Sequence, residues 1–224
     1  MTAREMDHLI RADRDIILSI IPEGAHVLDL GCGDGGLLAE LVERKHVIGR
    51  GVEIDEENLM RAMDHGLSVC QGDLDDGLSD FPDDSYDFVI LNQTLQVIKR
   101  PVTVMREMLR VGRYGIVGFP NFGHVCLRSR LLFSGRMPKT QALPFEWHDT
   151  PNIHQLTISD FRDLCRAEGV AVAREEYYML GKWRCSGLVN PFANLLAVTG
   201  MFVISIKDRG RLSCPGAPTR NGGL

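Results

Sequence analysis

Residues 27–36, which read VLDLGCGDGG, constrain the fold of this chain more than any other segment. An apolar run that fits a buried strand leads into four glycines within six positions, and apolar residues resume at helical spacing from Leu37. A strand, a glycine-rich turn and a helix in this order let the backbone approach a ligand closely. They also point the free N–H groups at the start of the helix toward that ligand. The segment therefore predicts a cofactor-binding site.

The glycines alone allow two kinds of cofactor. Residues 31–36 satisfy both the dinucleotide pattern G-x-G-x-x-G and the G-x-G-x-G pattern of proteins that bind S-adenosylmethionine (SAM). Two acids distinguish them, because Asp29 precedes the loop and Asp34 lies inside it. Carboxylates repel the pyrophosphate of NAD but attract the sulfonium and ammonium groups of SAM. The acids therefore favour SAM, and a nicotinamide oxidoreductase is the weaker alternative.

The rest of the chain alternates between predicted strands and helices. We expect strands at residues 26–30, 47–53, 67–71, 86–91, 114–119, 170–178 and 201–206. We expect helices at residues 7–20, from the glycine-rich loop to about 43, and at 55–64, 101–109 and 159–168. This alternation predicts an α/β fold with a doubly wound, mostly parallel sheet and helices on both faces. In such a sheet the ligand binds at the carboxyl ends of the strands, beside the first strand.

Polar side chains follow the ends of three predicted strands. Glu53 ends the second strand, where its carboxylate can accept hydrogen bonds from both ribose hydroxyls. Asp73 follows the third strand, where it can accept the adenine amine, and Asn92 follows the fourth. Each of them alone fits a solvated turn residue. Together, and in register with the glycine-rich loop, they indicate a nucleoside site.

Composition argues against several classes of site and partner. The net charge of −5 does not indicate a general surface for nucleic acid or an anionic membrane. The longest apolar run, residues 195–206, is too short to span a bilayer, and the charged N-terminal segment lacks the apolar core of a signal peptide. Six scattered cysteines without C-x-x-C spacing predict reduced thiols, no metal site and a cytoplasmic protein. We expect one domain over residues 1–212 and a disordered tail at 213–224.

Further motifs carry a resemblance to a known family. GVEID at residues 51–55 and QGDLDDGL at 71–78 extend the similarity to class I SAM-dependent methyltransferases beyond the glycine-rich loop. GFPNFGH at 118–124 and GRMPKTQALPFEWHDTPNIH at 135–154 are not general features of those enzymes. With these two motifs, the chain resembles the MetW family of methionine-biosynthesis proteins over residues 20–180.

The resemblance implies a seven-stranded sheet with an antiparallel last strand, and SAM or S-adenosylhomocysteine (SAH) as the ligand. It also implies a partner, a homoserine O-acetyl- or O-succinyltransferase, which a MetW-like protein supports as an accessory or activating subunit. The alternative is a catalytically active methyltransferase with an unidentified acceptor. Because SAM is a downstream product of methionine, a third role for it is that of an end-product signal. The predicted cofactor site comprises Asp29, Gly31, Cys32, Gly33, Gly35, Glu53, Ile54, Asp73, Leu74 and Asn92.

Residues 120–157 interrupt the alternation and are predicted to form a helical or irregular insertion. Asn121 and His124 follow the fifth predicted strand and are the candidate catalytic residues. Methyl transfer needs mainly positioning, and a base only where the acceptor loses a proton. Residues 128–139 hold four basic side chains and no acid around an apolar Leu-Leu-Phe. Such a segment fits a lid over the pocket, a docking surface for the partner, or a solvated helix face.

Overall fold

The computed structural model describes residues 3–140, 143–179, 183–186 and 192–206. The strands are β1 His26–Leu30, β2 Ile48–Glu53, β3 Ser68–Gln71, β4 Tyr86–Asn92, β5 Gly112–Pro120, β6 Val170–Met179, β7 Trp183–Ser186 and β8 Ala197–Ile206. The α-helices are α1 Ala3–Ile20, α2 Gly36–Lys45, α3 Glu56–Asp64, α4 Pro101–Val111, α5 Val125–Ser134, α6 Ile158–Ala167 and α7 Ala193–Leu196. Two short 3₁₀ helices are η1 Leu74–Asp76 and η2 Leu95–Val97.

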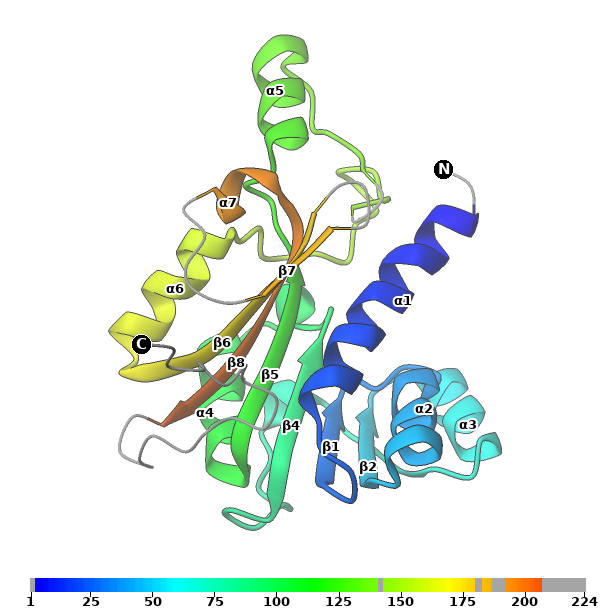
Figure 1. The fold of residues 1–224 in the computed structure, drawn as a ribbon. Coiled ribbons are helices and arrows are strands. Elements are labelled where there is room, and N and C mark those ends of the chain that lie inside the picture. The colour runs from blue at the N-terminus through cyan, green and yellow to red at the C-terminus, as the bar shows by residue number, and fades with distance from the viewer. Residues whose placement is uncertain (1–2, 141–142, 180–182, 187–191, 207–224) are drawn as a thin grey trace, which may run out of the picture.

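The strands form one sheet in the order β3-β2-β1-β4-β5-β8-β6-β7 (Figure 1). β1 to β5 pair in parallel, and β8 pairs antiparallel with both β5 and β6. The seven predicted strands, the doubly wound α/β class and the antiparallel last strand are confirmed. β7 is an additional short strand that forms a hairpin with β6. The strand order reverses direction at β1, between β2 and β4, so a crevice opens there at the carboxyl ends.

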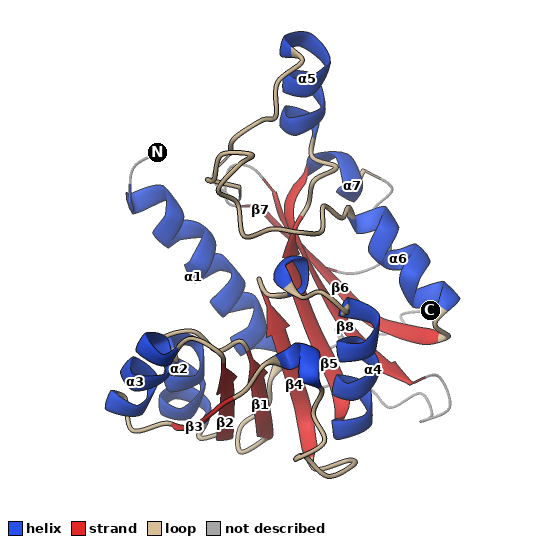
Figure 2. Cartoon of the chain, turned by 180° about the vertical axis from the view of Figure 1, so that it is seen from behind, coloured by secondary structure: helices blue, strands red, loops and turns tan. Residues whose placement is uncertain are grey.

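Side chains of the central strands alternate between two cores on opposite faces of the sheet. In β1, Val27 packs in one core with residues of α1 and α2, and Leu28 packs in the other with residues of α4. Phe88 and Val89 of β4 divide in the same way. Accordingly, α4 lies behind β5 in Figure 1 and in front of it in Figure 2. Burial of each such side chain contributes about 1.5–3 kcal/mol to the stability of the fold. This burial keeps the helices packed on both faces of the sheet.

Several helix starts follow from local capping. Asp55, the predicted cap, accepts a hydrogen bond from the backbone N–H of Asn58 at 2.9 Å and starts α3. Thr157 and Asp160 form a capping box at the start of α6. Pro101 occupies the first turn of α4, where the missing N–H has no intrahelical partner to lose.

The insertion at residues 120–157 contains α5, which stands away from the sheet in both views (Figures 1 and 2). Leu127 is the buried residue of this helix, and the rest of α5 is half-buried or exposed. The sequence of this segment lacks helical periodicity because α5 has no long face that packs on the body of the protein. At the other end of the chain, α1 begins four residues before the predicted residue 7.

The predicted tail at residues 213–224 lies outside the described residues, as does Cys214. Cys32, Cys70, Cys126 and Cys165 are free thiols. The described residues contain no cluster of His, Cys, Asp or Glu side chains that could hold a metal ion. They also contain no helix with the length and apolar character needed to cross a membrane.

Candidate functional site

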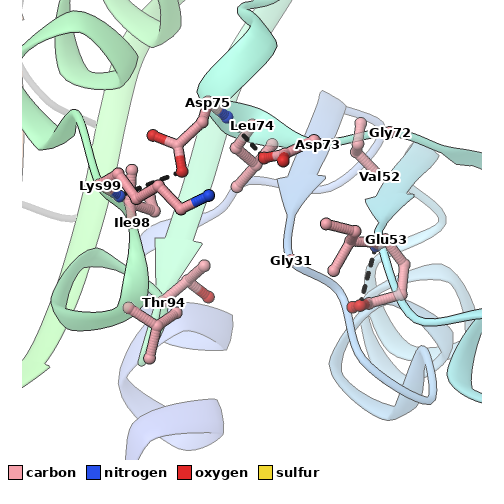
Figure 3. A pocket seen from close by; sticks show the side chains of 12 residues that line it. Gly31, Val52, Glu53, Gly72, Asp73, Leu74, Asp75, Thr94, Ile98 and Lys99 are labelled. Atoms are coloured by element: carbon pink, nitrogen blue, oxygen red, sulfur yellow. Dashed lines mark hydrogen bonds between the residues drawn. The ribbon is translucent and has the colours of Figure 1, made fainter. Parts of the chain in front are cut away.

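A cleft of about 330 Å³ opens at the carboxyl ends of β1, β2 and β3. We call it the cofactor cleft (Figure 3). Five of the residues predicted for the cofactor site line it: Gly31, Glu53, Ile54, Asp73 and Leu74. The other lining residues are Val52, Gly72, Asp75, Thr94, Val97, Ile98 and Lys99. The structure thus brings the glycine-rich loop and the acids that follow β2 and β3 to one cleft.

The glycines of the loop serve different purposes. Gly31 has a φ of 71°, and a Cβ on it would lie 2.8 Å from Cγ2 of Thr94, so this glycine permits close packing of Thr94. A Cβ on Gly35 would lie 2.5 Å from Cδ1 of Leu67, so this glycine permits close packing of the loop. Gly33 has a φ of 56° and would place a Cβ in open space. Gly33 and Gly35, both predicted for the cofactor site, are not among the residues that line the cofactor cleft.

Glu53 joins the end of β2 to the glycine-rich loop. Its side chain is 7% exposed. Oε2 accepts a hydrogen bond from the Gly33 N–H at 2.7 Å. Oε1 accepts from the backbone N–H groups of Ile54 at 2.9 Å and Asp55 at 3.0 Å. A carboxylate offers about four acceptor positions, so roughly one is left for a ribose hydroxyl. If Glu53 is to accept hydrogen bonds from both ribose hydroxyls, its hydrogen bond with the Gly33 N–H must be shared or broken.

Asp29, at the end of β1, is 3% exposed and lies behind the loop, outside the lining of the cofactor cleft. Burial and, to a smaller extent, the charge of Glu53 raise the pKa of its carboxyl to about 7, although the charge of Arg14 acts in the opposite direction. Near neutral pH a substantial fraction of Asp29 is therefore protonated. A cationic group placed beside it would favour the ionised form.

The third strand end contributes a pair of linked acids. Asp73 accepts a hydrogen bond from the Asp75 N–H at 2.9 Å and caps η1. Asp75 in turn accepts from the backbone N–H groups of Lys99 at 3.1 Å and Arg100 at 2.8 Å. Figure 3 shows Asp75 and Lys99 side by side on the wall of the cofactor cleft. Asp75 therefore ties the β3 side of the cleft to the segment that follows η2.

Two predicted cofactor-site residues point elsewhere. The side chain of Cys32 is buried against β2, where a Cβ on Gly51 would lie 2.6 Å from its Sγ. Burial raises the pKa of this thiol to about 12, with smaller contributions from neighbouring acids, so it stays protonated. The Oδ1 of Asn92 lies against Gly118 of β5, where it would clash with a Cβ. This oxygen is buried without a hydrogen-bond donor among the described residues.

The two predicted catalytic residues lie outside the cofactor cleft. The amide of Asn121 donates to the carbonyl groups of Asn194 and Ala197 and accepts from the N–H groups of Gly123 and Ile158. These four bonds give Asn121 a structural role. His124 caps α5, because its Nδ1 accepts a hydrogen bond from the Cys126 N–H at 3.2 Å. Burial lowers the pKa of this imidazole, which favours its neutral form.

Sequence reasoning missed the contribution of α1. Asp13 is buried and accepts hydrogen bonds from Nε2 of Gln93 at 2.8 Å and from the hydroxyl of Thr199 at 3.3 Å. Gln93 has a φ of 56°, and its backbone N–H donates to the Gly118 carbonyl. Asp13 therefore fastens α1 to the ends of β4 and β8. A signal was present, because Asp13 lies on the same helical stripe as Ile16 and Ile20.

A wall of the cofactor cleft is also joined to the insertion. The backbone carbonyl of Gln96, in η2, accepts hydrogen bonds from the N–H groups of Ile153 at 2.9 Å and His154 at 3.0 Å. Val97 on the same turn lines the cofactor cleft, and Asn152 lines a second cleft with Trp147 and Phe145. The two clefts are thus connected through main-chain groups.

Comparison with known proteins gives the family. A family model described as "Methionine biosynthesis protein MetW" matches residues 11–204. The chain belongs to the MetW family. A curated MetW relative from Rhodopirellula baltica, "Bifunctional methionine biosynthesis protein MetXA/MetW", is 42% identical over 181 residues. The match covers 77% of this chain and 29% of the relative, so the chain corresponds to less than a third of that longer protein.

Solved structures show the same fold at low sequence identity. A SAM-dependent methyltransferase from Thermotoga maritima, described as a possible histamine N-methyltransferase, has a TM-score of 0.61 and 17% identity over 90% of this MetW-family chain and 97% of its own. Magnesium protoporphyrin IX methyltransferase from Synechocystis, solved with bound SAH, has a TM-score of 0.64 and 17% identity over 91% and 86% of the two chains. The fold is therefore that of class I methyltransferases.

Proposed function

We propose that this MetW-family protein binds SAM or SAH in the cofactor cleft and acts in the cytoplasm as an accessory, activating subunit of a homoserine O-acetyl- or O-succinyltransferase. The observation that carries the proposal is the curated relative, whose name joins MetXA and MetW in one bifunctional chain. Joining two proteins in one chain holds them at high effective concentration, which favours a contact between them. Proteins encoded separately need a surface that makes the same contact.

The chemistry of the cofactor cleft supports the ligand. Its acids, Glu53 and Asp73, suit the hydroxyls and the exocyclic amine of an adenosine, and Leu74 and Ile98 supply apolar wall for a purine ring. The space at Gly33 allows close approach to the backbone. No phosphate needs to be accommodated in SAM or SAH, which agrees with the acids around the loop. When bound, SAM supplies a methyl group on a cationic sulfur.

A catalytically active methyltransferase is the second candidate, because the solved relatives of this fold include SAM-dependent methyltransferases. Asn121 is a poor candidate for a catalytic residue of such an enzyme, because its side-chain amide already makes four hydrogen bonds with backbone groups. Production of SAH with a defined acceptor would favour this candidate.

The test is the rate of the acyltransferase encoded in the same organism, measured with and without the purified protein. We expect the two proteins to copurify and the rate to rise when both are present. An acyltransferase that is equally active alone and does not bind this chain would contradict the accessory role. Calorimetric titration with SAM, SAH and NAD tests the ligand separately, and we expect binding of the first two only.

A further inference from the structure

The second cleft has a volume of about 270 Å³ and lies within the insertion at residues 120–157, so we call it the insertion cleft. Large apolar side chains line much of it: Phe122, Met137, Leu143, Phe145 and Trp147. The insertion cleft and the cofactor cleft share no lining residue in the part of the chain that the structure describes. A molecule in the insertion cleft would therefore not displace the ligand of the cofactor cleft.

The size and the exposure of the insertion cleft suit side chains of another protein. A cavity of about 150 Å³ holds one benzene ring, so this volume accommodates one or two large apolar side chains. Trp147 is 74% exposed, and Phe145 and Met137 are each 47% exposed. Aromatic and methionine side chains gathered at one accessible place are enriched at protein interfaces.

Two carboxamides line the same cleft with their hydrogen-bonding groups unused. Asn152 is half-buried and Gln155 is exposed, and no hydrogen bond joins either side-chain amide to another described residue. The backbone of Asn152 is held in place, because its N–H donates to Oγ1 of Thr150 at 3.2 Å. A carboxamide offers both a donor and an acceptor, as a peptide group does. The two amides therefore suit the backbone of a peptide segment.

The insertion is basic although the chain is acidic. Residues 125–139 hold four basic side chains and no acid, in a chain with a net charge of −5. Lys139, which lines the cleft, pairs with Glu146 at 2.8 Å. Arg136 is exposed beside Met137, and its guanidinium has no hydrogen bond or ion pair with a described residue. This charge favours a partner segment that carries acids next to its apolar side chain.

The insertion cleft is built from the part of the chain that interrupts the α/β alternation. Phe122 belongs to GFPNFGH at residues 118–124, and the other lining residues, apart from Gln155, belong to the motif at residues 135–154. Figures 1 and 2 show α5 and the segment after it beyond the carboxyl end of β5, away from α2, α3 and α4. A partner can therefore reach this cleft without contact with the helices that pack around the cofactor cleft.

We infer that the insertion cleft receives a peptide segment of the homoserine acyltransferase, one that carries a large apolar side chain with acidic residues beside it. This inference rests on the proposed function, which supplies the partner, and it adds the place and the chemistry of the contact. The apolar side chain contacts Trp147 and Phe145. The peptide backbone pairs with Asn152 and Gln155, and the acids face Arg136.

The test measures the affinity of this protein for the acyltransferase encoded in the same organism, by calorimetry. We expect Trp147→Ala to weaken the complex roughly tenfold or more, because tryptophan in an interface cleft is a typical anchor. Arg136→Glu should also weaken it, and more at low salt than at high salt. Neither change should alter the affinity for SAM or SAH, since both residues lie outside the cofactor cleft.

The matched controls are Met63→Ala, at a 57% exposed position of α3, and Arg113→Glu, at an exposed position near the start of β5. Both should bind the acyltransferase as the parent does. If Trp147→Ala and Arg136→Glu also bind as tightly as the parent, the inference is overturned and the proposed function stands. A parent protein that does not bind the acyltransferase would refute the proposed function, and the inference with it.

Photocrosslinking identifies the occupant of the insertion cleft directly. Trp147→p-benzoylphenylalanine should crosslink to the acyltransferase, in a segment where a large apolar residue stands beside Asp or Glu. Mass spectrometry of the crosslinked peptide shows which segment it is. A basic segment, or one without a large apolar residue, would overturn the inference. So would a crosslink to a second copy of this chain when the acyltransferase is present.

Discussion

At the scale of single residues, Gly33 is the sharpest test of the cofactor cleft. Its φ of 56° strains any β-branched side chain, and a Cβ there would enter the open space in front of the loop. We expect Gly33→Val to abolish SAM and SAH binding in calorimetry while the protein stays folded by circular dichroism. Gly66→Val is the matched control, since Gly66 has a φ of 74° and equally open space in the turn after α3. It should share the cost of strain, about 1–2 kcal/mol, and keep the ligand.

Asp29 predicts a pH dependence of binding. Its pKa of about 7 in the free protein falls when a ligand ammonium lies beside it, so binding releases a proton below that pH. We therefore expect SAH affinity to rise from pH 5.5 to pH 7.5 and to level off above the free pKa. In Asp29→Asn this rise should be absent, and the affinity should be lower at the upper end of the range. An equally steep rise in the variant would assign the effect to another group.

The same raised pKa bears on stability. An acid with a pKa above its unfolded value of 3.8 stabilises the fold fully at low pH, and this contribution is lost as the pH rises through about 7. The change in unfolding free energy caused by Asp29→Asn should therefore be more favourable at pH 8 than at pH 5, by on the order of 2–4 kcal/mol. Urea unfolding of both proteins at the two pH values measures the difference.

The sequence predicted the acids of the site better than its apolar and basic walls. Glu53 and Asp73 were predicted because Glu53 ends a strand and Asp73 follows one, and both strands are recognisable from their apolar residues. Thr94 and Lys99 belong to the irregular segment around η2, where no periodicity marks which side chains face the cleft. The direction of the Cys32 side chain could not be predicted, because it depends on positive φ values in the glycine-rich turn that the sequence does not specify.

At the scale of elements, the long amphipathic helices were predicted to within a few residues, because each buries a periodic stripe in one of the two cores. The segment of α5 was predicted only as a helical or irregular insertion, and β7 was not among the predicted strands. α5 has a single buried residue, and the predicted alternatives for its segment were a lid, a docking surface or a solvated face. Its basic residues are partly used, since Arg128 donates to the Gly123 carbonyl and Arg130 to that of Lys139. Leu131, Leu132 and Phe133 of α5 are exposed apolar side chains.

We therefore expect α5 to contribute to the contact with the acyltransferase. Leu132 is 76% exposed and Phe133 is 85% exposed, and large apolar side chains this accessible are enriched at protein interfaces. Leu132→Asp with Phe133→Asp should weaken the complex at least tenfold in pull-down or calorimetry without lowering the melting temperature. Met60→Asp, at a 55% exposed position of α3, is the control and should bind normally. A complex indifferent to the double change would place the interface elsewhere.

At the scale of the whole molecule, the question is whether SAM is a signal or a methyl donor. If SAM reports the level of the end product, it must bind the free protein and the complex with different affinity, because equal affinity shifts no equilibrium. We expect the activity of the acyltransferase complex to change across a SAM titration, with a coupling of about 1–3 kcal/mol. Gly33→Val, which should not bind SAM, should show a flat response. A flat response in the parent, with steady release of SAH, would favour the methyltransferase.

The double hydrogen bond to the Gln96 carbonyl has a consequence for how this protein tolerates change. Both donors, Ile153 and His154, use backbone N–H groups, and the acceptor is a backbone oxygen. Replacing these side chains leaves all three groups in place, so residues 150–156 can drift in evolution while the bridge between the two clefts persists. An alanine scan would not detect these two hydrogen bonds, because it changes side chains only. Proline at residue 153 removes one of the donors, and a backbone ester at residue 154 removes the other.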